Sequence, residues 1–167
     1  GVNFCLFSEH AHAVYLCLYD HSGHSEVARV AMFRAEAGLW HVQIDGITAG
    51  QRYGFRAAGD FLPAQGHLFN VNKFLIDPYS YALHGEFETS TRHQVMDEMG
   101  KLCPLDNAYL MPKSIVTERS LYQGKRPNIS WADTVVYECH VKGWSARHGQ
   151  IAPSERGTFS ALASDEF

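Results

Sequence analysis

The feature that most constrains the fold of this chain is a series of short β-prone runs in its first 60 residues. Turn residues such as Gly, Asp and Ser separate five of these runs, which lie at 2–7, 14–19, 26–32, 39–44 and 51–57. Short strands at this spacing, with turn signals between them, are typical of an antiparallel sandwich. The sequence therefore predicts a mainly β fold, with an immunoglobulin-like antiparallel β-sandwich over residues 1–85.

The stretch 66–81 indicates how this domain ends. Its apolar run 74–76 is followed by Asp77-Pro78, and proline disfavours helix in the residue before it and donates no hydrogen bond to a strand ladder. Asn70 and Asn72 carry short amides that bond nearby backbone and hold turns. On residue chemistry alone, we predict that this stretch forms the last strand of the β domain, held in place by its turn residues, after which the chain exits the domain.

Composition limits the classes of partner. The chain is 46% apolar and 19% charged, so it is expected to bury a core. Its net charge of −4 argues against nucleic acid and anionic membranes, which need a basic face, and is compatible with a neutral ligand such as a sugar. No run of about 18 apolar residues is present, so no membrane-spanning helix is expected.

The two ends of the sequence look cut. The chain begins inside a strand-like run, without Met and without the basic start of a signal peptide. It stops at Phe167, shortly after a single new strand-like run at 134–142. That run is rich in β-branched valine, whereas residues 86–107 are polar and aperiodic. We therefore expect a connector over 86–130 and a strand at 134–142.

Cysteine and histidine patterns predict neither a disulfide framework nor a cofactor. The four cysteines, none of them in a Cys-x-x-Cys pair, are Cys5, Cys17, Cys103 and Cys139. A reduced, cytoplasmic protein is the favoured interpretation. His10 and His12 flank one residue, and His21 and His24 share a loop, without the third ligand that a metal site needs. We expect exposed loop histidines; a metal or redox role is the weaker alternative.

Several patterns carry a family resemblance. They are Gly1-Val2-Asn3-Phe4-x-Leu6-Phe7-Ser8, Leu39-Trp40-His41, Gly50-Gln51-x-Tyr53-Gly54-Phe55-Arg56 and Gly66-His67-x-Phe69-Asn70-x-Asn72-Lys73-x-Leu75-x-Asp77-Pro78-Tyr79. Together they resemble the N-terminal region of glycogen debranching enzymes and isoamylases, the α-1,6-cleaving members of glycoside hydrolase family 13. The strands resemble that family's starch-binding-type module, carbohydrate-binding module family 48.

The resemblance continues into the second half of the chain. Residues 106–116 and 126–134 resemble the family's connector onto its catalytic domain, and 134–142 resembles the first strand of its (β/α)8 barrel. The resemblance implies that residues 131–167 are the incomplete start of that barrel. In the full enzyme, the barrel is expected to pack against the sandwich. Glycoside hydrolysis needs two placed carboxylates, which the resemblance puts on later strands. No catalytic residue is therefore expected in this chain, and Glu138 lies in a structural strand.

Candidate site residues are few. Glycogen-binding members of this module class present two exposed tryptophans, and the corresponding loops here offer no tryptophan and only Phe61. Phe61 and Trp40 are the candidates for carbohydrate binding, with core packing the alternative for Trp40. His140, Lys142 and Trp144 either border the substrate cleft of the full enzyme or pack in its core or rim.

The leading hypothesis is an N-terminal part of an enzyme that hydrolyses α-1,6 branch linkages in glycogen-like glucans. The part itself is expected to be inactive, and its partner is branched α-glucan through the full-length enzyme. A glucan-binding or protein-docking module without catalysis is the alternative from another class. The N-terminal part of a branching enzyme is the alternative within the family, because it shares the module and the barrel.

Overall fold

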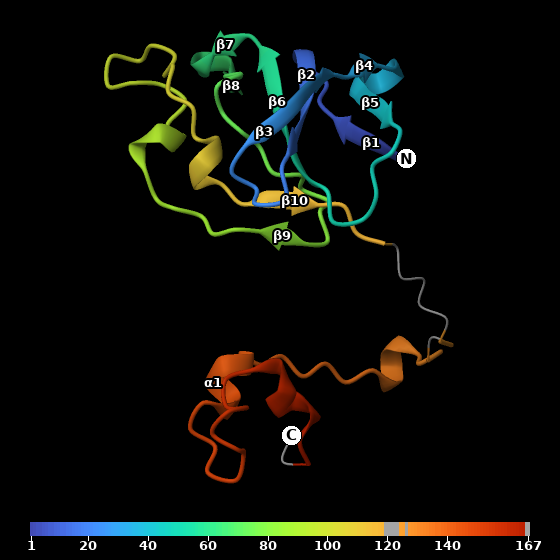
Figure 1. Ribbon diagram of the computed structural model, residues 1–167. Helices are drawn as coiled ribbons and strands as arrows, with labels where there is room; N and C mark the ends of the chain where they lie inside the picture. The colour runs from blue at the N-terminus through green and yellow to red at the C-terminus, as the bar shows by residue number, and fades with distance from the viewer. Residues whose placement is uncertain (119–123, 126, 166–167) are drawn as a thin grey trace. The chain divides into compact units, whose positions relative to one another are not determined.

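A computed structural model describes residues 1–118, 124–125 and 127–165. The chain forms two compact units, Gly1–Ser120 and Leu121–Phe167 (Figure 1). The expected connector over 86–130 is divided between them, because residues 86–118 lie in the first unit. Among the described residues, no helix is both long enough and apolar enough to cross a bilayer.

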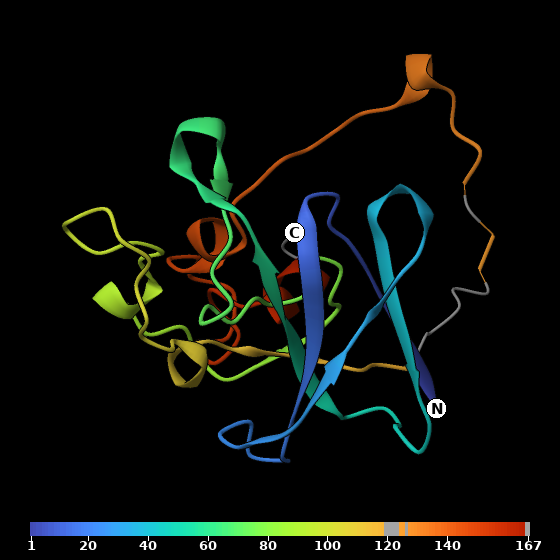
Figure 2. The same cartoon turned by 90° about the horizontal axis from the view of Figure 1, so that it is seen from above.

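The first unit is built from antiparallel sheets. Its strands are β1 (Val2–Phe7), β2 (Ala11–Tyr19), β3 (Glu26–Ala31), β4 (Phe33–Arg34), β5 (Leu39–Ile44), β6 (Arg52–Gly59), β7 (Phe61–Leu62), β8 (His67–Leu68), β9 (Leu83–His84) and β10 (Lys113–Ile115). The larger sheet has the order β3-β2-β6-β10-β9, the smaller one β1-β5-β4, and β7 pairs with β8. β2 and β6 run side by side at the centre of the larger sheet (Figure 2). The predicted mainly β, antiparallel fold is confirmed.

The main core forms where the apolar sides of these strands meet. In β5, buried Trp40 and Val42 alternate with more exposed neighbours, as expected for a strand with one buried face. The ring of Phe4 in β1 meets Tyr53 of β6 edge-on, with centroids 4.9 Å apart, which joins the two sheets. The buried members of this core are Phe4, Ala11, Val14, Leu16, Leu18, Met32, Trp40, Val42, Tyr53, Phe55 and Ala57.

A second apolar cluster lies on the other side of β2. Cys17 and Tyr19 pack there against Phe74 and Ala108, which come from the segment after the sandwich strands. Tyr19 meets Phe74 edge-on at 5.4 Å. We call residues 69–112 the outer segment. Its contacts explain why the last four residues of β2 are buried on both faces.

Two polar side chains hold the outer segment in place. Asn70 Nδ2 donates hydrogen bonds to the carbonyls of Val95 at 3.1 Å and Cys103 at 2.8 Å. Lys73 Nζ donates to the carbonyl of Leu105 at 2.6 Å. Both side chains are buried, and a buried polar group is stable only when its hydrogen bonds are satisfied. These residues therefore fix loops that lie about 25 to 33 residues further along the chain.

Arg56 is a buried charge at the centre of β6. Its Nη2 lies 2.7 Å from an Asp106 carboxylate oxygen and 3.7 Å from one of Glu26. Its Nη1 donates to the carbonyl of Val71 at 3.1 Å. The Arg56 side chain is 2% exposed, so these partners replace part of the water that it loses on folding, while its buried Nε has no hydrogen-bond partner among the described residues.

Two predictions for this region need correction. Residues 74–76 do not form a strand, because β10 already occupies the edge of β6 at Arg52 and Tyr53, and Leu75 makes a single bridge to Phe55. Conversely, part of the expected connector does form a strand, since β10 lies within it. The short β10 closes the larger sheet between β6 and β9.

Helical segments are short throughout. The 3-10 turns are η1 (Glu36–Gly38), η2 (Pro63–Gln65), η3 (Thr91–His93), η4 (Ala108–Leu110), η5 (Trp131–Asp133) and η6 (Phe159–Ala163), and the α-helical segment is α1 (Val141–Ser145). In the second unit, Ser145 is fully buried with Ala161. Its hydroxyl accepts from the Gly157 backbone N–H at 2.8 Å, which anchors α1 to the following loop.

The strand predicted at 134–142 is not formed in the described part of the chain. Residues 134–140 have no regular structure, and 141–145 form α1 instead. Val135 and Val136 are 92% and 80% exposed. Strand propensity reflects packing against neighbouring strands as much as backbone preference, and none of the described strands pairs with this segment.

Candidate functional site

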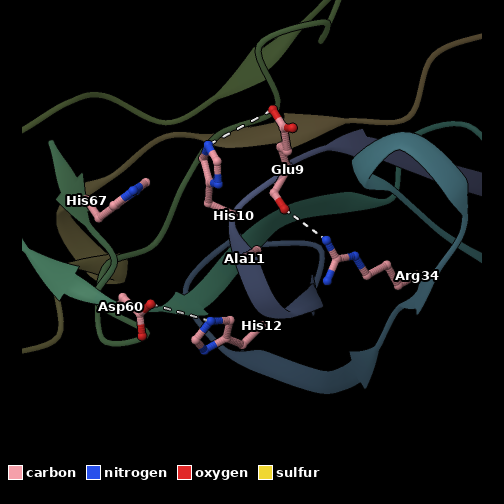
Figure 3. A pocket seen from close by; sticks show the side chains of 7 residues that line it. All are labelled: Glu9, His10, Ala11, His12, Arg34, Asp60 and His67. Carbon is pink, nitrogen blue, oxygen red and sulfur yellow. Dashed lines mark hydrogen bonds and ion pairs between the residues drawn. The ribbon is translucent and has the colours of Figure 1, made fainter. Parts of the chain in front are cut away.

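A polar hollow of about 250 Å³ lies where several strand ends of the first unit meet. Its lining comes from the turn between β1 and β2, from β2 and β4, and from the β6–β7 and β8 region: Glu9, His10, Ala11, His12, Arg34, Asp60 and His67 (Figure 3). In Figure 3, His67 and Asp60 lie on one side of Ala11, and Arg34 lies on the other. We call this site the histidine-lined hollow.

A β-bulge positions His12. The register between β2 and β6 shifts between Ala11, which faces Gly59, and Ala13, which faces Ala58. A bulge of this kind bends the strand and redirects side chains, and such bulges are frequent next to binding and active sites. His12 consequently points out of the sheet, with its Nε2 3.7 Å from an Asp60 carboxylate oxygen.

Close packing beneath the hollow positions His67. Gly59 has no side chain, and a Cβ there would lie 2.7 Å from the Phe69 ring, so Phe69 packs directly onto β6. Phe69 in turn stacks under His67, with ring centroids 6.5 Å apart and planes 20° apart. His67 meets His10 edge-on at 4.7 Å. Glycine, phenylalanine and the two imidazoles therefore form one continuous packed wall.

Arg34 closes the opposite side. Its Nη2 donates to the Glu9 carbonyl at 2.9 Å, and its guanidinium lies 5.7 Å from the centre of the Trp40 ring. Glu9 also brings a carboxylate oxygen to 4.0 Å from His10 Nε2. Backbone and ring contacts thus hold this guanidinium at the rim of the hollow.

The chemistry of the hollow suits a neutral, hydroxyl-rich ligand. Arg34 supplies one positive charge, Glu9 and Asp60 supply two negative ones, and imidazole nitrogens act as both donors and acceptors. This balance does not favour an anion. Across the part of the chain that the structure describes, no three His, Cys, Asp or Glu residues are grouped to hold a metal ion.

The two predicted carbohydrate-binding aromatics lie outside the hollow. Trp40 is 4% exposed and its Nε1 donates to the Ser8 carbonyl at 2.9 Å. A ring in this position packs in the core and offers no face to a sugar, so its alternative role as a core residue is the one found. Phe61 is half-buried in β7, opposite Leu68 of β8.

The three predicted cleft-border residues lie in and before α1. His140 caps this segment, its Nδ1 accepting from the Gly143 backbone N–H at 3.0 Å. Trp144 stacks on His148, with centroids 5.6 Å apart and planes 19° apart. Lys142 is exposed. None of the three side chains lines either of the two pockets described in the first unit.

A protein-family comparison identifies the sandwich. Residues 1–80 match the model of carbohydrate-binding module 48, described as the isoamylase N-terminal domain. This match covers just under half of the chain. The family 48 module therefore includes β1 to β8 and the tethering residues Asn70 and Lys73.

Curated relatives extend the match beyond the module. The chain is 41% identical over 165 residues to a glycogen debranching enzyme of Yersinia pestis, and 41% identical over 164 residues to one of Cronobacter sakazakii. These alignments cover 98% and 97% of this chain but 24% of each enzyme. The chain thus spans about a quarter of the length of the curated relatives it matches, and it is homologous to their N-terminal part.

Solved structures share the fold. A pullulanase from Paenibacillus barengoltzii, solved with maltohexaose and α-cyclodextrin, gives a TM-score of 0.63 at 22% identity, covering 98% of this chain and 21% of that one. The catalytic module of a multi-modular glycogen-degrading pneumococcal virulence factor gives 0.60 at 21% identity, covering 96% of this chain and 22% of that one. At this identity, the likeness shows a shared fold alone.

Four polar residues of the hollow were not predicted from the sequence: Glu9, Arg34, Asp60 and His67. They lie in different elements, so sequence spacing does not connect them. The available signals were the His10-x-His12 pair and an aspartate directly after a strand, at Asp60. His10 and His12 are exposed, as expected, but His12 lies within β2 and not in a loop.

Proposed function

We propose that this chain is the N-terminal part of a longer enzyme that hydrolyses α-1,6 branch linkages in glycogen-like glucans. The observation that carries this proposal is the 41% identity with glycogen debranching enzymes over 98% of the chain. The family 48 module and the sugar-bound pullulanase with the same fold support an α-glucan as partner. Four unpaired cysteines in the described residues fit a reducing, cytoplasmic setting.

In this proposal the chain contributes no catalytic carboxylate. Hydrolysis of the branch linkage requires a carboxylic acid to protonate the leaving oxygen and a carboxylate to attack the sugar. Both are assigned to parts of the longer enzyme outside residues 1–167. The module occupies residues 1–85, the connector 86–130, and the start of a (β/α)8 barrel 131–167.

The start of the barrel is assigned to residues 134–142, which include two highly exposed valines. Val135 and Val136 are β-branched and highly exposed, and such residues are stable in a strand once other strands cover them. We propose that 134–142 becomes the first barrel strand when the remaining strands are present. His140, Lys142 and Trp144 then lie toward its carboxyl end, where barrel enzymes form their clefts.

Product analysis tests the proposed reaction. The longer enzyme, incubated with a branched limit dextrin, is expected to release linear oligosaccharides together with new reducing ends, and the 167-residue chain is expected to release none. A branching enzyme would shorten and transfer chains without new reducing ends. Activity in the 167-residue chain, or transfer by the longer enzyme, would overturn the proposal.

A binding module without catalysis is the second candidate. The polar, preformed hollow favours it, because such a site is useful without any catalytic group nearby. In that case the longer protein would bind glucan in solution and release no sugar from it.

A further inference from the structure

We propose that the histidine-lined hollow binds a terminal glucosyl unit of an α-glucan chain. The choice of an α-glucan rests on the proposed function, and the site itself rests on the geometry of the hollow. Neither Phe61 nor a tryptophan lines this hollow, although Asp60, which does, directly precedes Phe61 in the chain.

The hollow presents the polar groups that a sugar ring needs. A glucosyl unit offers several hydroxyl groups that both donate and accept hydrogen bonds. His12 and Asp60 lie 3.7 Å apart, and His10 and Glu9 lie 4.0 Å apart, which is too far for good mutual hydrogen bonds. Their polar atoms therefore keep the capacity to bind hydroxyl groups placed between them.

The walls are arranged before any ligand arrives. The bulge sets His12, and the packing of Phe69 against Gly59 sets His67. Arg34 is held by the Glu9 carbonyl and the Trp40 ring. A ligand that binds to side chains already in place loses less affinity to ordering them.

The size of the hollow selects one sugar unit. Its volume of about 250 Å³ lies below the range of about 300 to 1,000 Å³ that is usual for drug-sized ligands. The side chains of His10, His12 and Asp60 are more than half exposed, so the site opens to solvent. A single ring therefore fits inside while the rest of the glucan chain continues outward, which favours a chain end.

Histidine NMR on the 167-residue chain tests this assignment. Titration with maltotetraose is expected to shift the imidazole resonances of His10, His12 and His67, and to leave those of His24 and His148 unchanged. His24 is exposed in the turn after β2 and His148 lies in the second unit, so both serve as internal controls. The readout does not require hydrolysis, so a failed binding site and a failed enzymatic proposal are told apart.

Variants sharpen the test. Asp60→Ala removes a charged acceptor and is expected to weaken maltotetraose binding about tenfold, and His67→Ala is expected to weaken it as well. His24→Ala is the matched control and is expected to bind like the unaltered chain. Shifts confined to residues near Phe61, loss of binding in Phe61→Ala with Asp60→Ala unaffected, or no shifts at all would each overturn the proposal.

Discussion

At the scale of single residues, the sandwich depends on charge partners for Arg56. This guanidinium is buried in β6, whereas its partner Asp106 is about half exposed, at 51% of its side chain. Asp106 also accepts from the Ala108 backbone N–H at 2.7 Å. One carboxylate therefore neutralises a buried charge and holds the turn at η4.

Removal of this carboxylate is predicted to destabilise the first unit. Because Arg56 then keeps its charge with weaker partners, Asp106→Ala is expected to lower the free energy of unfolding by about 2 to 3 kcal/mol, somewhat less than for a fully buried pair. Urea unfolding measures this change. Asp45→Ala, at an exposed position, is the control, and an equal effect of the two substitutions would contradict the role assigned to Asp106.

Cys17 makes the fold sensitive to alkaline pH. Burial first, and the Glu26 carboxylate second, raise the pKa of this thiol from 9.0 to about 11. The unfolded thiol ionises from about pH 9, while the folded one keeps its proton. The free energy of unfolding is thus expected to be unaffected by this group below pH 9 and to fall as the pH rises toward 11.

Unfolding experiments between pH 7 and 10.5, with a reductant present, test this dependence. Cys17→Ala is expected to show a shallower alkaline loss of stability than the unaltered chain, by about 1 to 2 kcal/mol at the upper end of the range. Tyr19 and Tyr53, whose pKa values burial also raises, remain in both proteins. Identical pH profiles for the two proteins would refute the assignment to Cys17.

At the scale of elements, β6 joins the core to the outer segment through a glycine. A Cβ on Gly54 would lie 2.1 Å from the Phe74 ring and 2.8 Å from the Leu75 carbonyl. The absence of a side chain lets Phe74 pack against the strand, next to Tyr19. The close approach of Phe74 to the sheet thus requires glycine at this position.

Gly54→Ala is therefore predicted to push Phe74 away from β6. Overpacking of this kind is expected to cost about 1 to 3 kcal/mol and to make the outer segment easier to cleave in limited proteolysis. Gly149→Ala, where nothing lies within 4 Å of the added Cβ, is the matched control. A stability and cleavage pattern unchanged by Gly54→Ala would show that the outer segment does not depend on this contact.

The elements that the sequence predicted correctly are those with local signals. The five β-prone runs correspond to β1, β2, β3, β5 and β6, because alternation and turn residues are visible within each run. β10 escaped prediction because it is three residues long and begins with a buried lysine. The Lys113 amine is satisfied by the carbonyls of Ala108 and Met111, both at 2.6 Å, and no sequence pattern reveals such partners.

The candidate site was less predictable for a physical reason. The residues of the histidine-lined hollow come together only through a bulge in β2 and a close approach of Phe69 to Gly59. Both depend on how β2, β6 and β8 meet in space. The sequence prediction concentrated on aromatic rings, and it could not show that Trp40 would be enclosed by the core.

At the scale of the whole molecule, the second unit exposes several large apolar side chains. Trp131, Val135, Val136 and Phe159 are each at least 80% exposed. Large exposed apolar surface commonly marks a region that another part of a protein covers. In the longer enzyme that we propose, the remaining barrel strands cover this apolar surface.

Hydrogen–deuterium exchange at residues 134–140 tests most directly whether this chain is one part of a larger debranching enzyme. In the 167-residue chain, the amides of Val135 and Val136 are expected to exchange within seconds, since they belong to no strand pair of the described structure. In the longer enzyme, the same amides are expected to be protected by at least 100-fold (about 2.7 kcal/mol), as members of a central strand. Rapid exchange in both proteins, or protection already present in the 167-residue chain, would contradict the account.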